Sequence, residues 1–220
     1  MSGRRWRFWG ACLAAAVAAV VAPGLSRSDE RASAAPPTES SSWRVGASVL
    51  LYVLRDAADY FQPTATVDRG FLHLEARYNY ESRETGSAWL GVNFSFGETL
   101  KLGLTPMVGG VFGQMNGIAT GLTITLNWGP LALWDQSEYV FDLADSSKDY
   151  FYVWGELSVS VPEWLRMGLV LQRTRVFHTS SAVQAGPLIG VSIWKLAATA
   201  YLFSPGQDDQ FVVVALAGAF

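Results

Sequence analysis

The sequence has almost none of the residues that metal, disulfide and thiol chemistry require. Cys12 is the one cysteine among 220 residues, and there are only two histidines, His73 and His178. A chain with a single cysteine cannot build a disulfide framework. The sequence also contains no Gly-rich phosphate loop, no metal-ligand cluster and no repeat of solenoid period. It therefore predicts neither a metal ion nor a cofactor.

The apolar segment near the N-terminus, Ala11 to Ala22, is too short and too rich in alanine to cross a bilayer as a helix. It follows three arginines within the first seven residues, and this order of a basic and an apolar region is typical of an export signal. We predict a signal peptide over residues 1–35, with a retained membrane anchor as the alternative. Residues 36–42, rich in Ser and Pro, are expected to form a short disordered leader.

Positive charge is scarce once the signal peptide is removed. Cleavage takes away five of the 16 basic residues and two of the 19 acidic residues, which leaves 11 and 17 and a formal net charge of −6. This balance argues against nucleic acid as a partner. The remaining residues, 43–220, are enough for one domain, and no linker divides them.

From Trp43 onward the sequence alternates between apolar and polar residues, as β-strands do. One clear segment has an apolar face of Leu72, Leu74, Ala76, Tyr78 and Tyr80, and a polar face of His73, Glu75, Arg77, Asn79 and Glu81. In a soluble β protein the apolar face is the core, whereas in a transmembrane barrel it faces lipid and the polar face lines the lumen.

Two features favour the transmembrane arrangement. The polar faces carry Gly, Ser, Thr and Asn but few lysines, which suits a confined lumen. Aromatic residues gather near segment ends, as expected for the two interfaces of a membrane; they are Trp43, Tyr78, Tyr80, Phe94, Phe96, Trp128, Tyr139, Phe141 and Phe151.

The connections between segments alternate between tight turns and longer polar loops, which is typical of an up-and-down barrel with its turns on the periplasmic side. We predict a closed antiparallel transmembrane β-barrel of about 12 strands, with ten as the alternative. The predicted strands are 43–54, 61–68, 71–81, 87–97, 100–112, 117–128, 131–142, 149–161, 165–177, 184–194, 196–204 and 210–220.

The C-terminal strand carries a further signal. Val212, Val214, Leu216 and Phe220 fall on one face at a period of two. This segment resembles the C-terminal signal of Gram-negative outer-membrane β-barrel proteins, which ends in Phe after alternating apolar residues, although Gly218 departs from that pattern. The resemblance implies location in the outer membrane and insertion by the barrel-assembly machinery through this strand. We expect a monomer surrounded by outer-membrane lipid and lipopolysaccharide.

If the polar faces point inward, they bring charged side chains into the lumen, where they require partners or water. The candidate lumen charges are Arg44, His73, Glu75, Arg77, Lys101, Glu138, Glu156 and Arg166. They are compatible with a constriction that selects solutes by charge, and equally with a salt-bridged plug in a barrel of this width.

Three charged residues do not fit the inward polar face. Asp135 continues the apolar face of Leu131 and Leu133. Arg173 and Arg175 likewise continue an outward face, so that either a β-bulge near Gln172 turns them inward or they lie above the bilayer and contact lipopolysaccharide phosphates. We favour the lipopolysaccharide contact, because both arginines lie near the loop end of their strand.

No convincing catalytic constellation emerges. A serine hydrolase needs a histidine beside a serine and an orienting polar group, and neither His73 nor His178 meets this requirement in sequence. We therefore expect a narrow porin-like channel or a plugged barrel without enzyme activity. The alternatives are a lipid-modifying outer-membrane enzyme and a soluble periplasmic β-barrel that binds an apolar ligand.

Overall fold

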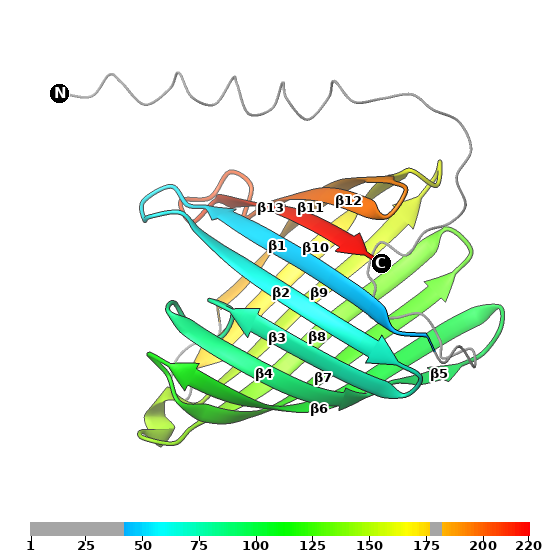
Figure 1. Ribbon diagram of the computed structural model, residues 1–220. Helices are drawn as coiled ribbons and strands as arrows, with labels where there is room; N and C mark the ends of the chain where they lie inside the picture. The colour runs from blue at the N-terminus through cyan, green and yellow to red at the C-terminus, as the bar shows by residue number, and fades with distance from the viewer. Residues whose placement is uncertain (1–41, 177–181) are drawn as a thin grey trace.

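The alternating segments form long antiparallel strands in the computed structural model, which describes residues 42–176 and 182–220 (Figure 1). The predicted signal peptide and most of the leader lie outside these residues and stay predictions. The strands are β1 Arg44–Val53, β2 Tyr60–Arg69, β3 Leu72–Tyr78, β4 Thr85–Val92, β5 Phe94–Phe96, β6 Leu100–Gly113, β7 Gly117–Trp128, β8 Leu131–Asp142, β9 Tyr150–Ser160, β10 Leu165–Val176, β11 Ala182–Ile193, β12 Leu196–Phe203 and β13 Phe211–Ala219. A short 3-10 helix, η1 Ser146–Lys148, lies between β8 and β9.

The sheet closes on itself because its last strand pairs with its first. β13 runs antiparallel to β1, with Val53 opposite Val212 and Gly46 opposite Ala219. The backbone hydrogen bonds continue to the end of the chain, where the N–H of Val45 donates to the carbonyl of Phe220 at 2.9 Å. Closure leaves no open sheet edge in the described part of the chain, which removes the usual template for edge-to-edge aggregation.

β4 and β5 are two parts of one strand. Both pair with β6, and the register continues without a shift from Gly91 opposite Met107 to Phe94 opposite Leu104. Counted in this way, the described residues form a closed barrel of 12 strands. The predicted fold is confirmed, and the ten-strand alternative is wrong.

The barrel buries its charged and hydroxyl-bearing residues inside, together with some aromatic and aliphatic side chains, and exposes a band of large apolar residues on its outer face. On β7, Thr123 and Thr125 are buried inside, while Ile118 and Trp128 are more than half exposed on the outer face. A soluble barrel with an apolar interior would show the opposite arrangement, so that alternative is wrong. Among the described residues, no helix is long and apolar enough to cross a membrane.

Exposed aromatic residues form two belts on the outer wall, as expected for a transmembrane barrel. One belt lies near the turns and contains Trp43, Phe71, Phe94, Phe96, Trp128, Trp164, Trp194 and Phe220. The other lies near the loops and contains Phe61, Tyr78, Phe112 and Phe141. Tyr139 and Phe151 lie in the same belt and are half-buried.

The prediction for the end of the third strand is wrong. β3 ends at Tyr78, because Asn79 adopts a left-handed backbone conformation with φ of 58°, which asparagine tolerates better than most residues. The Asn79 side chain stabilises this turn by accepting a hydrogen bond from the N–H of Glu84 at 2.7 Å. The turn reverses the alternation, so that Tyr80 points into the lumen instead of toward the interface.

Candidate functional site in the barrel lumen

Six of the eight charged residues expected in the lumen have side chains that are at most 10% exposed: His73, Glu75, Arg77, Glu138, Glu156 and Arg166. The other two lie at the turn end, where Arg44 is half-buried and Lys101 is exposed. The six buried residues form two hydrogen-bonded groups on different parts of the inner wall.

The first group crosses the lumen. The Arg77 guanidinium on β3 donates to the Glu138 carboxylate on β8 at 2.7 Å. These strands are separated along the wall by β4, β6 and β7, so that the ion pair joins distant parts of the barrel. Arg77 also donates to Glu75 on its own strand, and Tyr150 donates to Glu138 at 3.3 Å.

Two aromatic rings lie against the Arg77 guanidinium. Its central carbon lies 4.4 Å from the ring centre of Tyr80 and 4.5 Å from that of Trp89, in the geometry of a cation–π contact. The Tyr80 hydroxyl reaches across to Gln136 on β8 at 2.9 Å, and its ring packs edge-on against Tyr152 on β9. These contacts connect the end of β3 with β8 and β9 across the lumen at the level of Arg77.

His73 extends the same network toward the turn end. One of its ring nitrogens lies 2.9 Å from Asp68 and the other lies 3.1 Å from Glu75. Asp68 in turn accepts a hydrogen bond from Asn93 at 2.7 Å, and Asn93 accepts one from Thr105. Both nitrogens of this fully buried histidine are thus engaged by carboxylates.

The second group lies on β9, β10 and β12. Arg166 donates to Glu156 at 2.8 Å and to the hydroxyl of Thr199 at 2.8 Å. The indole N–H of Trp154 donates to the other oxygen of Glu156. The charge of Arg166 is therefore matched by the carboxylate of Glu156, which Trp154 also holds.

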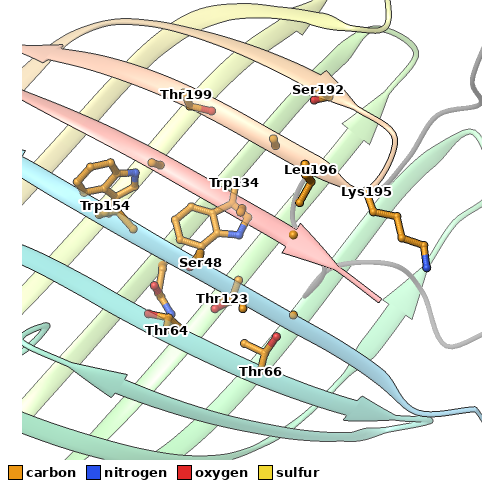
Figure 2. A pocket seen from close by; sticks show the side chains of 18 of the residues that line it. Ser48, Thr64, Thr66, Thr123, Trp134, Trp154, Ser192, Lys195, Leu196 and Thr199 are labelled. Atoms are coloured by element: carbon orange, nitrogen blue, oxygen red, sulfur yellow. The ribbon is translucent and has the colours of Figure 1, made fainter. Parts of the chain in front are cut away.

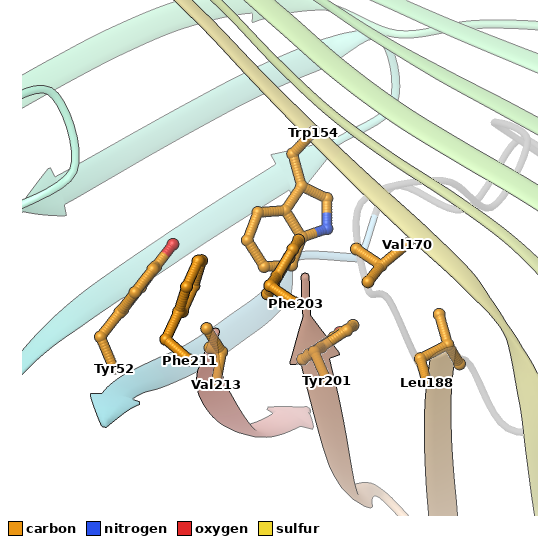
Figure 3. Packing of buried hydrophobic residues seen from close by; sticks show 8 residues of the cluster. All are labelled: Tyr52, Trp154, Val170, Leu188, Tyr201, Phe203, Phe211 and Val213. Carbon is orange, nitrogen blue, oxygen red and sulfur yellow. The ribbon is translucent and has the colours of Figure 1, made fainter. Parts of the chain in front are cut away.

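An aromatic layer fills the loop half of the lumen (Figure 3). Phe203 stacks on Phe211 with ring centres 4.7 Å apart, and Trp154 packs edge-on against Phe203 at 5.2 Å. Tyr52 continues the stack on β1. Tyr152 packs against both this layer and a second buried cluster around Trp89 and Val140, so that it connects the two clusters.

The turn half of the lumen is open. A cavity of about 160 Å³ extends inward from the β11–β12 turn, with Lys195 at its turn end, Trp154 at its inner end and Trp134 between them (Figure 2). We refer to this cavity as the vestibule. Its walls are lined by small and hydroxyl-bearing residues, which include Ser48, Thr64, Thr66, Thr123, Ala197, Thr199, Ala215 and Ala217.

The sizes of the inward residues explain both the vestibule and the layer. On three neighbouring strands the side chains grow from the turn end to the loop end. The series are Gly46, Ser48, Leu50 and Tyr52 on β1, then Ala197, Thr199, Tyr201 and Phe203 on β12, and Ala217, Ala215, Val213 and Phe211 on β13. Small residues leave space where large ones would close the barrel.

On the outer wall, β10 shows no bulge. Gln172, Arg173 and Thr174 pair with consecutive residues of β9, so that Arg173 points outward, where it is exposed near the loop end. The backbone of Arg175 continues this register, but its side chain lies outside the described residues. The bulge alternative is therefore wrong for Arg173, and the proposed lipopolysaccharide contact stays a prediction.

Asp135 lies outward on β8, four residues from Leu131, which pairs with Trp128 of one aromatic belt, and four from Tyr139 in the other. This position is near the middle of the apolar band. Its carboxylate lies over Gly155 of β9, which has no side chain to cover it.

Replacing Asp135 by leucine is expected to stabilise the folded protein by about 1–2 kcal/mol, because an outward charge at this depth is unfavourable in lipid. Denaturant unfolding in lipid vesicles measures the change. Asp208→Leu, in an exposed loop, serves as the control and should leave the free energy of unfolding nearly unchanged. A loss of stability in Asp135→Leu would show that the carboxylate makes a favourable contact.

The described residues bring no nucleophile to His73, whose two nitrogens face Asp68 and Glu75. His178, the other histidine weighed for catalysis, lies outside the described residues. Within residues 42–176 and 182–220, no group of three or more His, Cys, Asp or Glu residues is arranged to hold a metal ion.

Several lumen residues escaped the sequence analysis. Asp68, Tyr80 and Glu81 all join the central network. Asp68 lies near the end of β2, where the alternation of that strand places it on the inward face. Tyr80 follows the reversal at Asn79, which the alternation pattern does not reveal. Glu81 lies on the predicted polar face, although it is not among the candidate lumen charges.

Comparison with known proteins agrees with this architecture. No family model and no curated protein matches the chain. Among solved structures, the KdgM porin is similar with a TM-score of 0.54 at 8% identity, covering 80% of this chain and 99% of that one. The same values hold for the KdgM porin in complex with disordered oligogalacturonate. The outer-membrane protein Omp33 of Acinetobacter baumannii is 13% identical over 81% of this chain and 97% of its own, with a TM-score of 0.44. The chain has the fold of a porin-like outer-membrane β-barrel.

Proposed function

We propose that this protein is an outer-membrane β-barrel whose lumen is closed to solutes at rest by its own side chains. The observation that carries the proposal is the ion pair between Arg77 and Glu138, which crosses the lumen at 2.7 Å. In this arrangement the turns and the vestibule face the periplasm and the longer loops face the cell exterior, as in other up-and-down outer-membrane barrels.

Two further contacts support closure. Tyr80 and Tyr152 meet across the lumen with ring centres 5.7 Å apart, beside the Arg77 ion pair. Nearer the loops, Phe203 and Val213 are fully buried inside the barrel wall. A barrel of 12 strands lies between the eight-stranded barrels that side chains fill and the 16- to 18-stranded porins that keep an aqueous channel. Here large residues occupy the loop half.

We further propose that the protein has no catalytic activity. A general base must reach the proton that it removes, whereas His73 is fully buried and held by two carboxylates. The similarity to porins points in the same direction, since these are channels. A lipid-modifying role would require a site that the lumen network does not supply.

The surroundings of the barrel follow from its outer wall. We propose that Arg173 contacts lipopolysaccharide phosphates, since guanidinium groups bind phosphate in bidentate fashion, and that Arg175 does the same. On β13, Val214, Leu216 and Phe220 are exposed on the outer face, where the assembly machinery would meet them. We expect the folded protein to be a monomer.

Planar lipid bilayers provide the direct test. The purified folded protein should give no stepwise conductance, because the lumen is filled at two levels. Heat-modifiable mobility in detergent gels confirms in parallel that the sample is a folded barrel. Regular conductance steps from a folded sample at low voltage would overturn the proposal and would favour a narrow open channel.

A further inference from the structure

The vestibule exists because small residues occupy the inward positions around it. In the turn half of β1, β12 and β13, the inward positions hold Gly46, Ser48, Ala197, Ala215 and Ala217. These residues form one continuous patch of small side chains, because Ser48 lies opposite Ala217 and Ala217 lies opposite Ala197 in adjacent strands. Trp134 faces this wall from β8. The result is a slot with an aromatic side and an aliphatic side.

Three charged residues line the vestibule; Glu75 and Arg166 already have partners of opposite charge within the barrel, and Lys195 lies at the turn end. Glu75 is bound by His73 and Arg77, and Arg166 is bound by Glu156 and Thr199. A charged ligand would lose its hydration on entry without finding a free counter-charge on these groups, and burying a charge in this way is costly. The inner part of the vestibule therefore favours an uncharged ligand.

Hydroxyl groups surround the slot. Ser48 and Thr64 lie opposite each other on β1 and β2, and Thr123, Ser192 and Thr199 contribute from β7, β11 and β12. Each hydroxyl can both donate and accept a hydrogen bond, so that the ring matches a ligand that does the same. Aromatic and aliphatic walls with a few polar groups are typical of small-molecule sites.

The size of the vestibule limits the ligand further. Its volume of about 160 Å³ is close to that of a cavity of roughly 150 Å³ that admits a single benzene ring. A space of this size takes one six-membered ring against Trp134, whereas the groups attached to that ring and any longer ligand would extend toward Lys195 at the open turn end.

From these features we propose that the vestibule binds one uncharged, hydroxyl-bearing six-membered ring, a neutral pyranose, which enters from the turn end. The ring stacks on the indole of Trp134, and its hydroxyl groups exchange hydrogen bonds with Ser48, Thr64 and the neighbouring hydroxyls. The proposal goes beyond the closed barrel proposed above and concerns only the turn half of the lumen, so that binding and conductance are measured independently.

The test uses saturation-transfer NMR on the folded full-length barrel in lauryldimethylamine oxide, because detergents with sugar headgroups would compete for the site. The probes are D-glucose, D-galactose and D-mannose, with glucuronate and glucosamine as anionic and cationic rings of the same size. We expect signals from one or more of the neutral sugars and signals at least about tenfold weaker from the two charged rings.

Two phenylalanine variants form a matched pair. Ala217→Phe fills the slot and should abolish the sugar signal, whereas Ala200→Phe, outward on the adjacent strand β12, should leave it unchanged. Thr64→Val removes one hydroxyl without changing the shape of the side chain and should weaken binding about fivefold. If Ala217→Phe does not fold, the Thr64→Val variant provides the test of the site.

Equal sugar signals from the wild type and Ala217→Phe would place binding elsewhere and overturn the proposal. No signal from any neutral sugar, or a stronger signal from a charged ring, would do the same. A conducting wild-type barrel that still binds sugar in an Ala217-dependent way would contradict the closed lumen but not the vestibule site.

Discussion

Arg77→Met is expected to lower the free energy of unfolding by about 3–5 kcal/mol, because removing one partner of a buried ion pair leaves the other charge without compensation. Arg77 is the guanidinium shared by Glu75 and Glu138, and Glu81 lies 3.8 Å from it. Methionine keeps much of the side-chain volume between Tyr80 and Trp89, so that the loss reports mainly on charge.

Urea or guanidinium unfolding in lipid vesicles, followed by tryptophan fluorescence, measures this effect. Arg83→Met is the matched control, because Arg83 is an exposed loop residue whose ring contact with Tyr60 lies at the surface. It should change stability by less than about 1 kcal/mol.

Adding Glu138→Gln to Arg77→Met should recover part of the loss, since it removes one of the carboxylates left without a partner. The difference between the double variant and the two single variants measures the coupling between the residues. Equal stability of Arg77→Met and Arg83→Met would show that water, and not Arg77, compensates the lumen carboxylates.

The double variant Phe203→Ala/Phe211→Ala is expected to give stepwise conductance in planar bilayers, where the wild type should give none. The two rings stack at 4.7 Å in the aromatic layer, directly beyond Tyr201, which lines the vestibule. Their removal extends the vestibule toward the loops. Each Phe→Ala change in a packed interior costs about 3–5 kcal/mol, and the two costs should not add because the rings are in contact.

Phe94→Ala/Phe96→Ala is the control for this measurement. These residues lie on the outer wall of β5, so that their loss alters the contact with lipid but not the lumen. Folding of each variant is checked by heat-modifiable mobility before the conductance is recorded. A folded Phe203→Ala/Phe211→Ala barrel that stays silent would show that the contacts around Arg77 close the lumen without the aromatic layer.

Much of the fold could be predicted because the sequence of a single β-strand already shows which of its faces is apolar and which is polar. Alternation at a period of two assigns each residue to one face of its own strand, and this assignment requires no knowledge of the neighbours. The predicted strand over residues 117–128 is therefore confirmed as β7, and its residues alternate as expected, with Thr123 inward and Trp128 outward. Local reasoning failed at Asn79, where one left-handed residue reverses the alternation.

The candidate site could be predicted only in part. The inward faces of His73, Glu75 and Arg77 follow from parity, but the contact of Arg77 with Glu138 does not. These residues are 61 positions apart in the sequence, and their strands are not adjacent in the sheet. Only the curvature of the closed wall decides which inward side chains meet across the lumen.

The sequence by itself determined the strands, their faces, the alternation of turns and loops and the pairing of the last strand with the first. Each of these depends on period, turn chemistry or closure, which are readable along the chain. The tertiary structure decided where the lumen is filled and where it is open. The physical reason is that a side chain closes a barrel only through what it touches on the far wall. The increase in side-chain size from Gly46 to Tyr52 therefore shapes the lumen only together with the parallel increases from Ala197 to Phe203 and from Ala217 to Phe211 on the adjacent strands.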